Sequence, residues 1–205
     1  MIISGYGLSA FKMEAKGTVL ATNPYDKASG LSAPRFEAQV VVASHTGFED
    51  SSIVGDPQIF SLPGEYDRAG ITIQGFQITP TWTAFLIEWE ELGMLFLGDG
   101  EDVPAEDVDR ALKDISDSID ILMLPVGDAF GIKAASALIQ SIEPRVVIPM
   151  RYRLTGAKEK LETLEAFLKQ SGLKADFMEK YSIKKKDLPP TGPQCVVLST
   201  PYDGK

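Results

Sequence analysis

The chain has 205 residues, of which 44% are hydrophobic and 24% are charged, the composition of an ordinary globular protein with a sizeable core. Its formal net charge of −9 at pH 7 argues against nucleic-acid binding, because DNA and RNA phosphates are contacted through clustered Lys and Arg. No apolar run approaches the roughly 18 residues of a membrane helix, and the first residues do not have the pattern of a secretory leader. The single cysteine permits no internal disulfide. We therefore expect a cytoplasmic protein without membrane contact.

The first half of the chain is rich in short predicted strands. These segments contain β-branched and aromatic residues and are separated by Gly, Pro and Asn turns. A Pro-Gly-Glu-Tyr sequence at residues 63–66 is predicted to form a turn with an aromatic anchor. The predicted strands cover residues 1–5, 10–14, 18–22, 39–44, 71–79, 84–89 and 94–97.

The second half alternates helices with buried strands. Pro104 stands at a first helical position and is followed by acidic residues, which predicts a helix over residues 104–112. Strands are predicted over residues 119–124, 145–150 and 195–199, and a second helix over residues 132–142.

A third predicted helix, over residues 157–171, has the clearest amphipathic pattern. Apolar side chains recur at helical spacing from Leu161 to Leu168, and Gly172 ends the pattern. No internal repeat or linker interrupts the chain. We therefore predict a single α/β domain over residues 1–205, with helices outside a mainly antiparallel sheet system.

The most informative residue is His45, the only histidine. It follows a predicted strand and shares a short polar loop with Glu49 and Asp50. Many α/β proteins build a metal site in such a loop, but metal-dependent hydrolysis usually needs three protein ligands and an open position for water. One imidazole cannot form an all-histidine zinc centre.

Several motifs follow one another in a recognisable order. They are Ser-Gly-Tyr-Gly-Leu-Ser-Ala-Phe at 4–11, Thr-Asn-Pro-Tyr at 22–25, Ser-His-Thr-Gly-Phe-Glu-Asp at 44–50, Pro-Gly-Glu-Tyr at 63–66, Leu-Gly-Asp at 97–99 and Ile-Pro-Met-Arg-Tyr at 148–152. In this order the chain resembles the metallo-β-lactamase superfamily, most nearly its small bacterial proteins classed as zinc-dependent hydrolases. The resemblance implies a four-layer αββα sandwich with strand-end loops around one or two metal ions at one edge.

The positions that bind metal in this family are mostly changed here. His45 matches the first histidine of the family's His-x-His-x-Asp-His loop, and Asp99 matches the aspartate that bridges two metals. The other positions have different residues, namely Leu8, Gly47, Asp50 and Arg151 in place of histidines, and Asn23 and Glu49 in place of aspartates.

The resemblance leaves few candidate ligands at either metal position. The first position retains His45 and Asp99. The second retains Glu49, Asp50 and Asp99, an all-oxygen set that suits Mg²⁺ or Mn²⁺ better than Zn²⁺. Arg151 would bring a permanent positive charge to the space that a metal would share. We predict that Arg151 substitutes for the ion by pairing with one or more of these acids.

Structural roles explain some of the same residues. Asp99 could form an Asx turn or cap the helix predicted near residue 104. His45 could bond to backbone at a strand end, and Glu49 and Asp50 could be first-turn acids of a short helix. Asp128, at a predicted strand-to-helix connection, could face the same cleft.

Two functions fit the sequence. The first is a protein that has lost most metal ligands, needs no cofactor and serves as a non-catalytic binding or interaction module, for instance as a homo-oligomer. The alternative is an ester or phosphoester hydrolase with one Mg²⁺, Mn²⁺ or Zn²⁺ ion, for which the candidate catalytic residues are His45 and Asp99. A serine nucleophile is disfavoured, because no Gly-x-Ser-x-Gly sequence is present.

Overall fold

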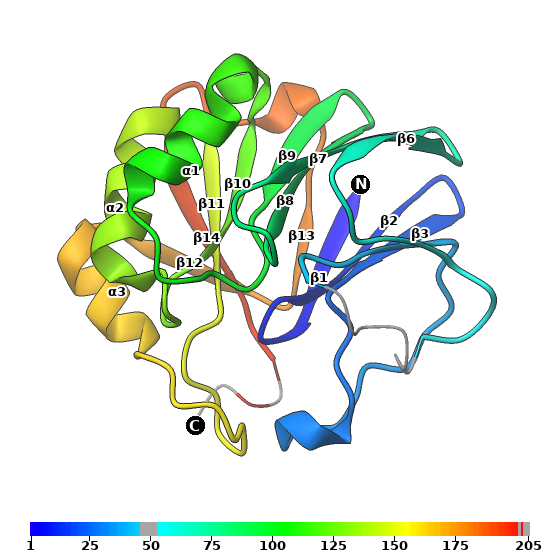
Figure 1. Ribbon diagram of the computed structural model, residues 1–205, viewed down its shortest axis with the longest axis horizontal. Coiled ribbons are helices and arrows are strands. Elements are labelled where there is room, and N and C mark those ends of the chain that lie inside the picture. The colour runs from blue at the N-terminus through cyan, green and yellow to red at the C-terminus, as the bar shows by residue number, and fades with distance from the viewer. Residues whose placement is uncertain (46–52, 201, 203–205) are drawn as a thin grey trace.

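Two β-sheets face each other in the computed structural model, which describes residues 1–45, 53–200 and 202 (Figure 1). The six-stranded sheet contains, in spatial order, β13 (Lys180–Ser182), β1 (Ile2–Gly7), β2 (Ala10–Ala15), β3 (Thr18–Thr22), β4 (Val40–Val42) and β5 (Gln58–Phe60). The eight-stranded sheet contains β12 (Ala175–Met178), β14 (Gln194–Leu198), β11 (Val146–Met150), β10 (Ile121–Pro125), β9 (Leu92–Phe96), β8 (Thr83–Trp89), β7 (Ile71–Gln77) and β6 (Gly64–Arg68).

Alternating side chains build the core between the sheets. In β2, Phe11 and Met13 are buried, whereas Lys12 and Glu14 are partly exposed on the other face. The central strands β9, β10 and β11 are buried at every position. Strands buried on both faces read as continuous apolar runs, which is why the sequence indicated these segments clearly.

The strand pairing is mixed, so the prediction of a mainly antiparallel sheet system was wrong. Strands β6 to β9 form an antiparallel meander, but β9, β10, β11, β14 and β12 are parallel neighbours. In the other sheet, β3, β4 and β5 are also parallel. Parallel neighbours require crossover connections, and α2 (Gly131–Ile142) forms the one between β10 and β11.

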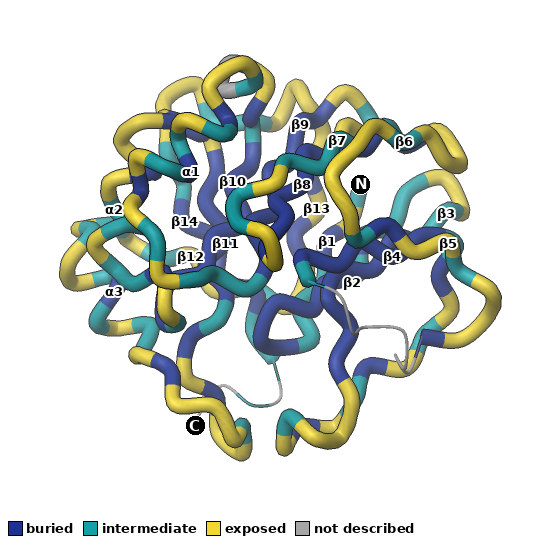
Figure 2. The backbone as a smooth tube through the Cα atoms, in the orientation of Figure 1, coloured by how far each residue is buried: buried dark blue, intermediate teal, exposed yellow. Residues whose placement is uncertain are grey.

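The α-helices of the described residues lie along one side of the molecule (Figure 1). Helix α2 contacts β10 and also α1 (Ala105–Leu112) and α3 (Leu164–Ser171). Figure 2 shows buried strands at the centre and exposed backbone along the outer side of the helices. Short 3-10 helices cover Lys27–Ser29, Lys113–Ser118 and Lys185–Asp187. No helix in the described part of the chain has the length and apolar character needed to cross a membrane.

Helix α3 begins later than predicted. Thr163 caps it by accepting a hydrogen bond from the amide of Ala166 at 3.2 Å. Just before this cap, the amide of Glu162 donates to Gly127 and its carbonyl accepts from Arg153. These long-range bonds hold the preceding residues outside the helix, although Leu161 is buried as its spacing suggested.

Strands β12 and β13 were not predicted, and neither were β5 and β6, which are next to each other in sequence. Residues 63–66 were expected to form a turn, but β6 already begins at Gly64. Tyr66 within it stacks on Phe60 with ring centroids 4.4 Å apart, and its hydroxyl donates to the carbonyl of Leu62 at 2.9 Å. All four strands are short and largely exposed, so the sequence carried little hydrophobic signal.

Strand ends converge at one edge of the sandwich and set up a polar site. Gly98, directly after β9, has a φ of +69°, and a Cβ at this position would collide with the side chain of Ser44, which follows β4. Leu8, Asn23 and Arg151 also have positive φ values, of 53°, 33° and 57°. These turns direct the chain around the edge, where several side chains meet.

Trp82 supports this edge, which leads to a testable prediction. Its ring is fully buried and its Nε1 donates to the carbonyl of Leu97 at 2.6 Å, just before Gly98. We expect Trp82→Phe to lower the free energy of unfolding by about 1–3 kcal/mol, because the Leu97 carbonyl would remain buried without its donor. Chemical denaturation followed by circular dichroism measures this change.

The matched control is Trp89→Phe. Trp89 is also buried, and the structure records no side-chain hydrogen bond for it among the described residues. Its substitution should remove apolar area without creating an unpaired carbonyl. Equal losses in the two variants would contradict a specific role for the Trp82 hydrogen bond.

Candidate functional site

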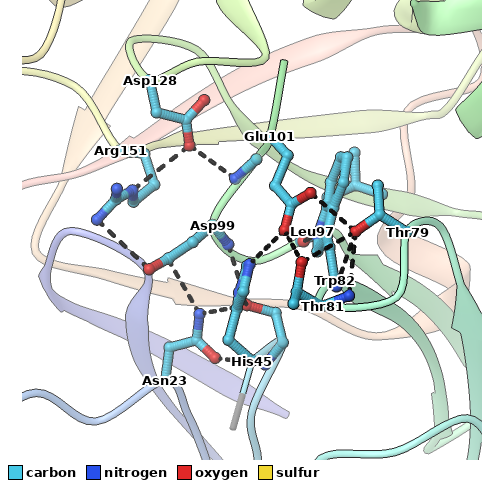
Figure 3. A network of polar contacts seen from close by, with 12 residues as sticks. Asn23, His45, Thr79, Thr81, Trp82, Leu97, Asp99, Glu101, Asp128 and Arg151 are labelled. Atoms are coloured by element: carbon cyan, nitrogen blue, oxygen red, sulfur yellow. Dashed lines mark hydrogen bonds and ion pairs between the residues drawn. The ribbon is translucent and has the colours of Figure 1, made fainter. Parts of the chain in front are cut away.

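Asp99 lies at the centre of the polar network at the sandwich edge (Figure 3). Its Oδ1 accepts hydrogen bonds from the Ser9 hydroxyl and, at 3.1 Å, from the Asn23 amide. Its backbone amide donates to Ser44 Oγ at 3.1 Å. Asp99 does not cap α1, whose N-cap is Pro104 without a side-chain hydrogen bond. The tertiary network, and not a local cap, therefore orients this carboxylate.

Arg151 is surrounded by three carboxylates. Its Nη1 lies 3.5 Å from Asp99 Oδ2, its Nε lies 3.4 Å from Asp128 Oδ2, and its Nη2 lies 2.7 Å from Glu159 Oε2. The Arg151 side chain is only 12% exposed. Burial alone would lower the pKa of Arg151, but the three acids outweigh burial and raise it. The guanidinium is therefore firmly charged.

Asp128, in the loop after β10, contacts Arg151 and therefore lies in the same polar network as Asp99, whereas its position facing a cleft stays a prediction. Its carboxylate accepts from the amides of Gly100 at 2.7 Å and Phe130 at 3.2 Å, and its side chain is 4% exposed. Burial raises the pKa of Asp128 to about 6, and Asp99 contributes in the same direction, although Arg151 and the two amides oppose the change.

His45 contacts side chains through both ring nitrogens. Its Nδ1 lies 3.0 Å from Ser44 Oγ, and its Nε2 lies 3.3 Å from Glu101 Oε1. The interpretation of His45 as a histidine bonded to backbone is therefore not what the structure shows. Ser44 is fully buried, so it is not accessible for attack on a substrate.

Glu101 was missed by the sequence analysis. It accepts hydrogen bonds from Thr81 at 2.6 Å and Thr79 at 2.8 Å as well as contacting His45. Burial by itself would raise the pKa of Glu101, but these hydrogen bonds dominate and lower it. Its position two residues after Asp99 was a signal that could have been used. Glu159 lies in an irregular loop and had no such signal.

Asn23 connects Ser44, Ser9 and Asp99 within this network. Its Oδ1 accepts from the amide of Ser44 at 2.8 Å. Its Nδ2 lies 2.9 Å from Ser44 Oγ and 3.0 Å from Ser9 Oγ. Asn23, Ser44 and Ser9 are buried, and every buried polar side-chain atom in the described residues has a hydrogen-bond partner.

The described side chains do not form a set of metal ligands. Over residues 1–45 and 53–200, no group of three or more His, Cys, Asp or Glu side chains is placed to hold an ion. His45 and Asp99, the two candidates that fall within these ranges, contact Glu101 and Arg151 respectively. The other two candidates, Glu49 and Asp50, lie outside the described residues.

Comparison with known proteins gives consistent similarities. A family model described as a β-lactamase superfamily domain matches residues 3–151. A search of curated proteins gave no match. Among solved structures, a proposed Zn-dependent hydrolase of the metallo-β-lactamase superfamily from Thermotoga maritima is 26% identical, with a TM-score of 0.78, and the match covers 96% of this chain and 98% of that one.

Two more distant structures share the fold. A metallo hydrolase from Ignicoccus hospitalis is 16% identical with a TM-score of 0.62, over 89% of this chain and 99% of that chain. An isothiocyanate hydrolase from Delia radicum gut bacteria is 11% identical with a TM-score of 0.63, over 83% and 91% of the two chains. These matches support the metallo-β-lactamase type of fold predicted from the motifs.

Replacing Arg151 tests its role in charge balance. We expect Arg151→Met to lower the free energy of unfolding by about 3 kcal/mol near neutral pH, because Asp99, Asp128 and Glu159 would lose their shared cation. Adding Asp99→Asn to this variant should recover part of the loss, a non-additivity that a double-mutant cycle measures. Arg153→Met is the matched control, since Arg153 is exposed and its Nε donates to the Leu161 carbonyl. An Arg151 variant as stable as this control would contradict the assigned role.

The raised pKa of Asp128 predicts that the stability of the protein depends on pH. Its pKa is raised in the folded protein from 3.8 to about 6, so the folded state holds its proton more tightly than the unfolded state. The resulting stabilisation is fully present below about pH 4 and is lost as the pH rises through 6, and its size is about 3 kcal/mol. The difference in unfolding free energy between the wild type and Asp128→Asn, measured from pH 4 to pH 8, should follow this curve. A difference that does not vary with pH would contradict it.

Proposed function

This chain belongs to the β-lactamase superfamily, and we propose that it is a member whose site is neutralised by Arg151 and serves non-catalytic binding or interaction. The contacts of the Arg151 guanidinium with Asp99, Asp128 and Glu159 carry this proposal. In such a site the guanidinium neutralises the carboxylates in place of a metal ion. The fold is retained, and the chemistry that depends on an open metal position is not.

Electrostatics makes Arg151 and a metal ion poor neighbours. At a separation of about 4 Å and an effective dielectric constant near 20, a guanidinium and a dication repel by roughly 8 kcal/mol. The Arg151 side chain is held by its three acidic contacts, and its own backbone amide donates to the carbonyl of Leu8 at 3.1 Å. Metal binding near Asp99 would therefore require the arginine to leave its partners.

Asp99 and His45, the two candidate metal ligands among the described residues, are already engaged by other protein groups. Asp99 Oδ2 faces Arg151, and Asp99 Oδ1 accepts from Ser9 and Asn23. Both nitrogens of His45 lie within hydrogen-bonding distance of protein oxygens. An ion would have to displace these contacts before it gained a ligand.

The alternative function is hydrolysis of an ester or phosphoester with one Mg²⁺, Mn²⁺ or Zn²⁺ ion. The similar Thermotoga maritima protein is described as a proposed Zn-dependent hydrolase, which keeps this alternative open. It would draw on Glu49 and Asp50 in addition to Asp99 and His45. In this case Arg151 would have to turn away from Asp99 in the active protein.

Elemental analysis separates the two functions. We expect protein purified without chelators or histidine tags to carry far less than one equivalent of any transition metal or Mg²⁺. Titration calorimetry with Mg²⁺, Mn²⁺ and Zn²⁺ should detect no specific site. A stoichiometric ion that is lost on Asp99→Ala would support the hydrolase and overturn the proposal.

Arg151→His provides a gain-of-binding test. This substitution removes the fixed cation and adds a nitrogen donor beside Asp99, so we expect measurable Zn²⁺ affinity where the wild type has none. Arg153→His adds a histidine nearby but leaves Arg151 in place and should bind no metal at the site. Equal metal affinity in the wild type and in Arg151→His would count against the proposed role of Arg151.

A further inference from the structure

The hydrogen bonds around Ser44 determine where its hydroxyl proton points. A hydroxyl oxygen has two acceptor sites and one proton to donate. Ser44 Oγ accepts from the Asn23 amide at 2.9 Å and from the Asp99 backbone amide at 3.1 Å. Two N–H donors use both acceptor sites. The hydroxyl proton must therefore go to the third partner, His45 Nδ1, at 3.0 Å.

The hydrogen bonds of Asn23 determine which end of its side-chain amide is the oxygen and which is the nitrogen. Its Oδ1 lies 2.8 Å from the backbone nitrogen of Ser44, and a backbone N–H can only donate. The opposite end of the amide is therefore the nitrogen, which can only donate to Ser44 Oγ. The direction of this hydrogen bond follows from the main chain.

The same reasoning extends to the other side of the imidazole. If His45 Nδ1 accepts the Ser44 proton, the proton of a neutral imidazole is on Nε2. Nε2 then donates to Glu101 Oε1, at 3.3 Å, and the carboxylate is also held by Thr79 and Thr81. Donors and acceptors match along the whole path from Asn23 through Ser44 and His45 to Glu101.

We propose that Asn23 is a positioning residue that sets the tautomer of His45 through Ser44. The imidazole is held as the Nε2–H form, with its remaining lone pair occupied by the Ser44 hydroxyl. His45 then has no free lone pair with which to act as a metal ligand or as a base. This inference rests on the proposed function and explains how the only histidine of the chain is kept from binding an ion.

An aspartate at position 23 would reverse the path. A carboxylate oxygen in place of Nδ2 would accept the Ser44 proton instead of donating to Ser44 Oγ. Ser44 Oγ could then accept from His45, which would have to carry its proton on Nδ1. The carboxylate would also stand beside Asp99 Oδ1, which now lies 3.1 Å from the amide nitrogen. Whether residue 23 is Asn or Asp would therefore determine the tautomer of His45, which lies two hydrogen bonds away.

Nitrogen NMR tests this inference with one labelled residue. Because the chain has a single histidine, labelling with ¹⁵N-histidine gives signals from His45 alone. Long-range ¹H–¹⁵N correlation spectra of the full-length protein at pH 8 distinguish the two tautomers. We expect the wild type to show a protonated Nε2 and a bare, hydrogen-bonded Nδ1. An Nδ1–H or doubly protonated imidazole in the wild type would overturn the inference.

Asn23→Asp should move the proton to Nδ1, whereas an unchanged Nε2–H pattern would overturn the role of Asn23. Ser9→Ala is the matched control, because Ser9 contacts Asn23 and Asp99 but not His45. It should leave the tautomer unchanged. If Asn23→Asp does not fold, Ser44→Ala replaces it and should shift the Nδ1 signal towards that of a free lone pair. No Nδ1 shift in Ser44→Ala would also overturn the inference.

The outcome is distinguishable from that of the proposed function. A metal found by elemental analysis beside an Nε2–H imidazole would refute the metal-free site but leave the tautomer assignment standing. Metal-free protein with an Nδ1–H imidazole would refute the assignment alone.

Discussion

The site depends on the compensation of clustered carboxylates by one guanidinium. Asp99, Asp128 and Glu159 come from three separate loops, and their mutual repulsion would push these loops apart without a cation between them. Arg151 holds them together from the end of β11. Its planar group offers donors in three directions, which a lysine ammonium at the same place would not match in geometry. The raised pKa of Asp128 shows that compensation is incomplete, since burial and a neighbouring acid still favour its protonated form.

The fold makes this arrangement possible by bringing strand ends together. Ser44, Asp99, Asp128 and Arg151 follow β4, β9, β10 and β11, and ligand sites in α/β proteins are commonly formed where parallel strands end. Close approach is essential, and Gly98 allows it because any side chain there would collide with Ser44. Trp82 then fixes the end of β9 from inside the core. Charge balance and packing are thus coupled at the same few residues.

The comparison structures place this site in context. The Thermotoga maritima protein matches nearly the full length of both chains at 26% identity, so the scaffold is shared while most side chains differ. A shared scaffold does not fix chemistry, which depends on the groups at the strand ends. In this chain those groups form a continuous path of hydrogen bonds and ion pairs from Glu101 to Arg151 (Figure 3), and Arg151 continues it to Glu159. Our proposed function and the proposed role of Asn23 both follow from that path.

The sequence alone determined the family, the buried strands and most helix positions, because motif order and hydrophobic spacing are local properties. It also identified His45 and Asp99 as candidate ligands, Arg151 as a cation predicted to replace a metal ion, and Asp128 as a possible neighbour of these residues. It could not place β5, β6, β12 and β13, which are short and largely exposed, or the start of α3, which long-range backbone bonds at Glu162 decide. Glu101 and Glu159 joined the site only in the tertiary structure. Hydrogen-bond direction and burial depend on which loops meet in space, and the spacing of residues along the chain does not determine which loops meet.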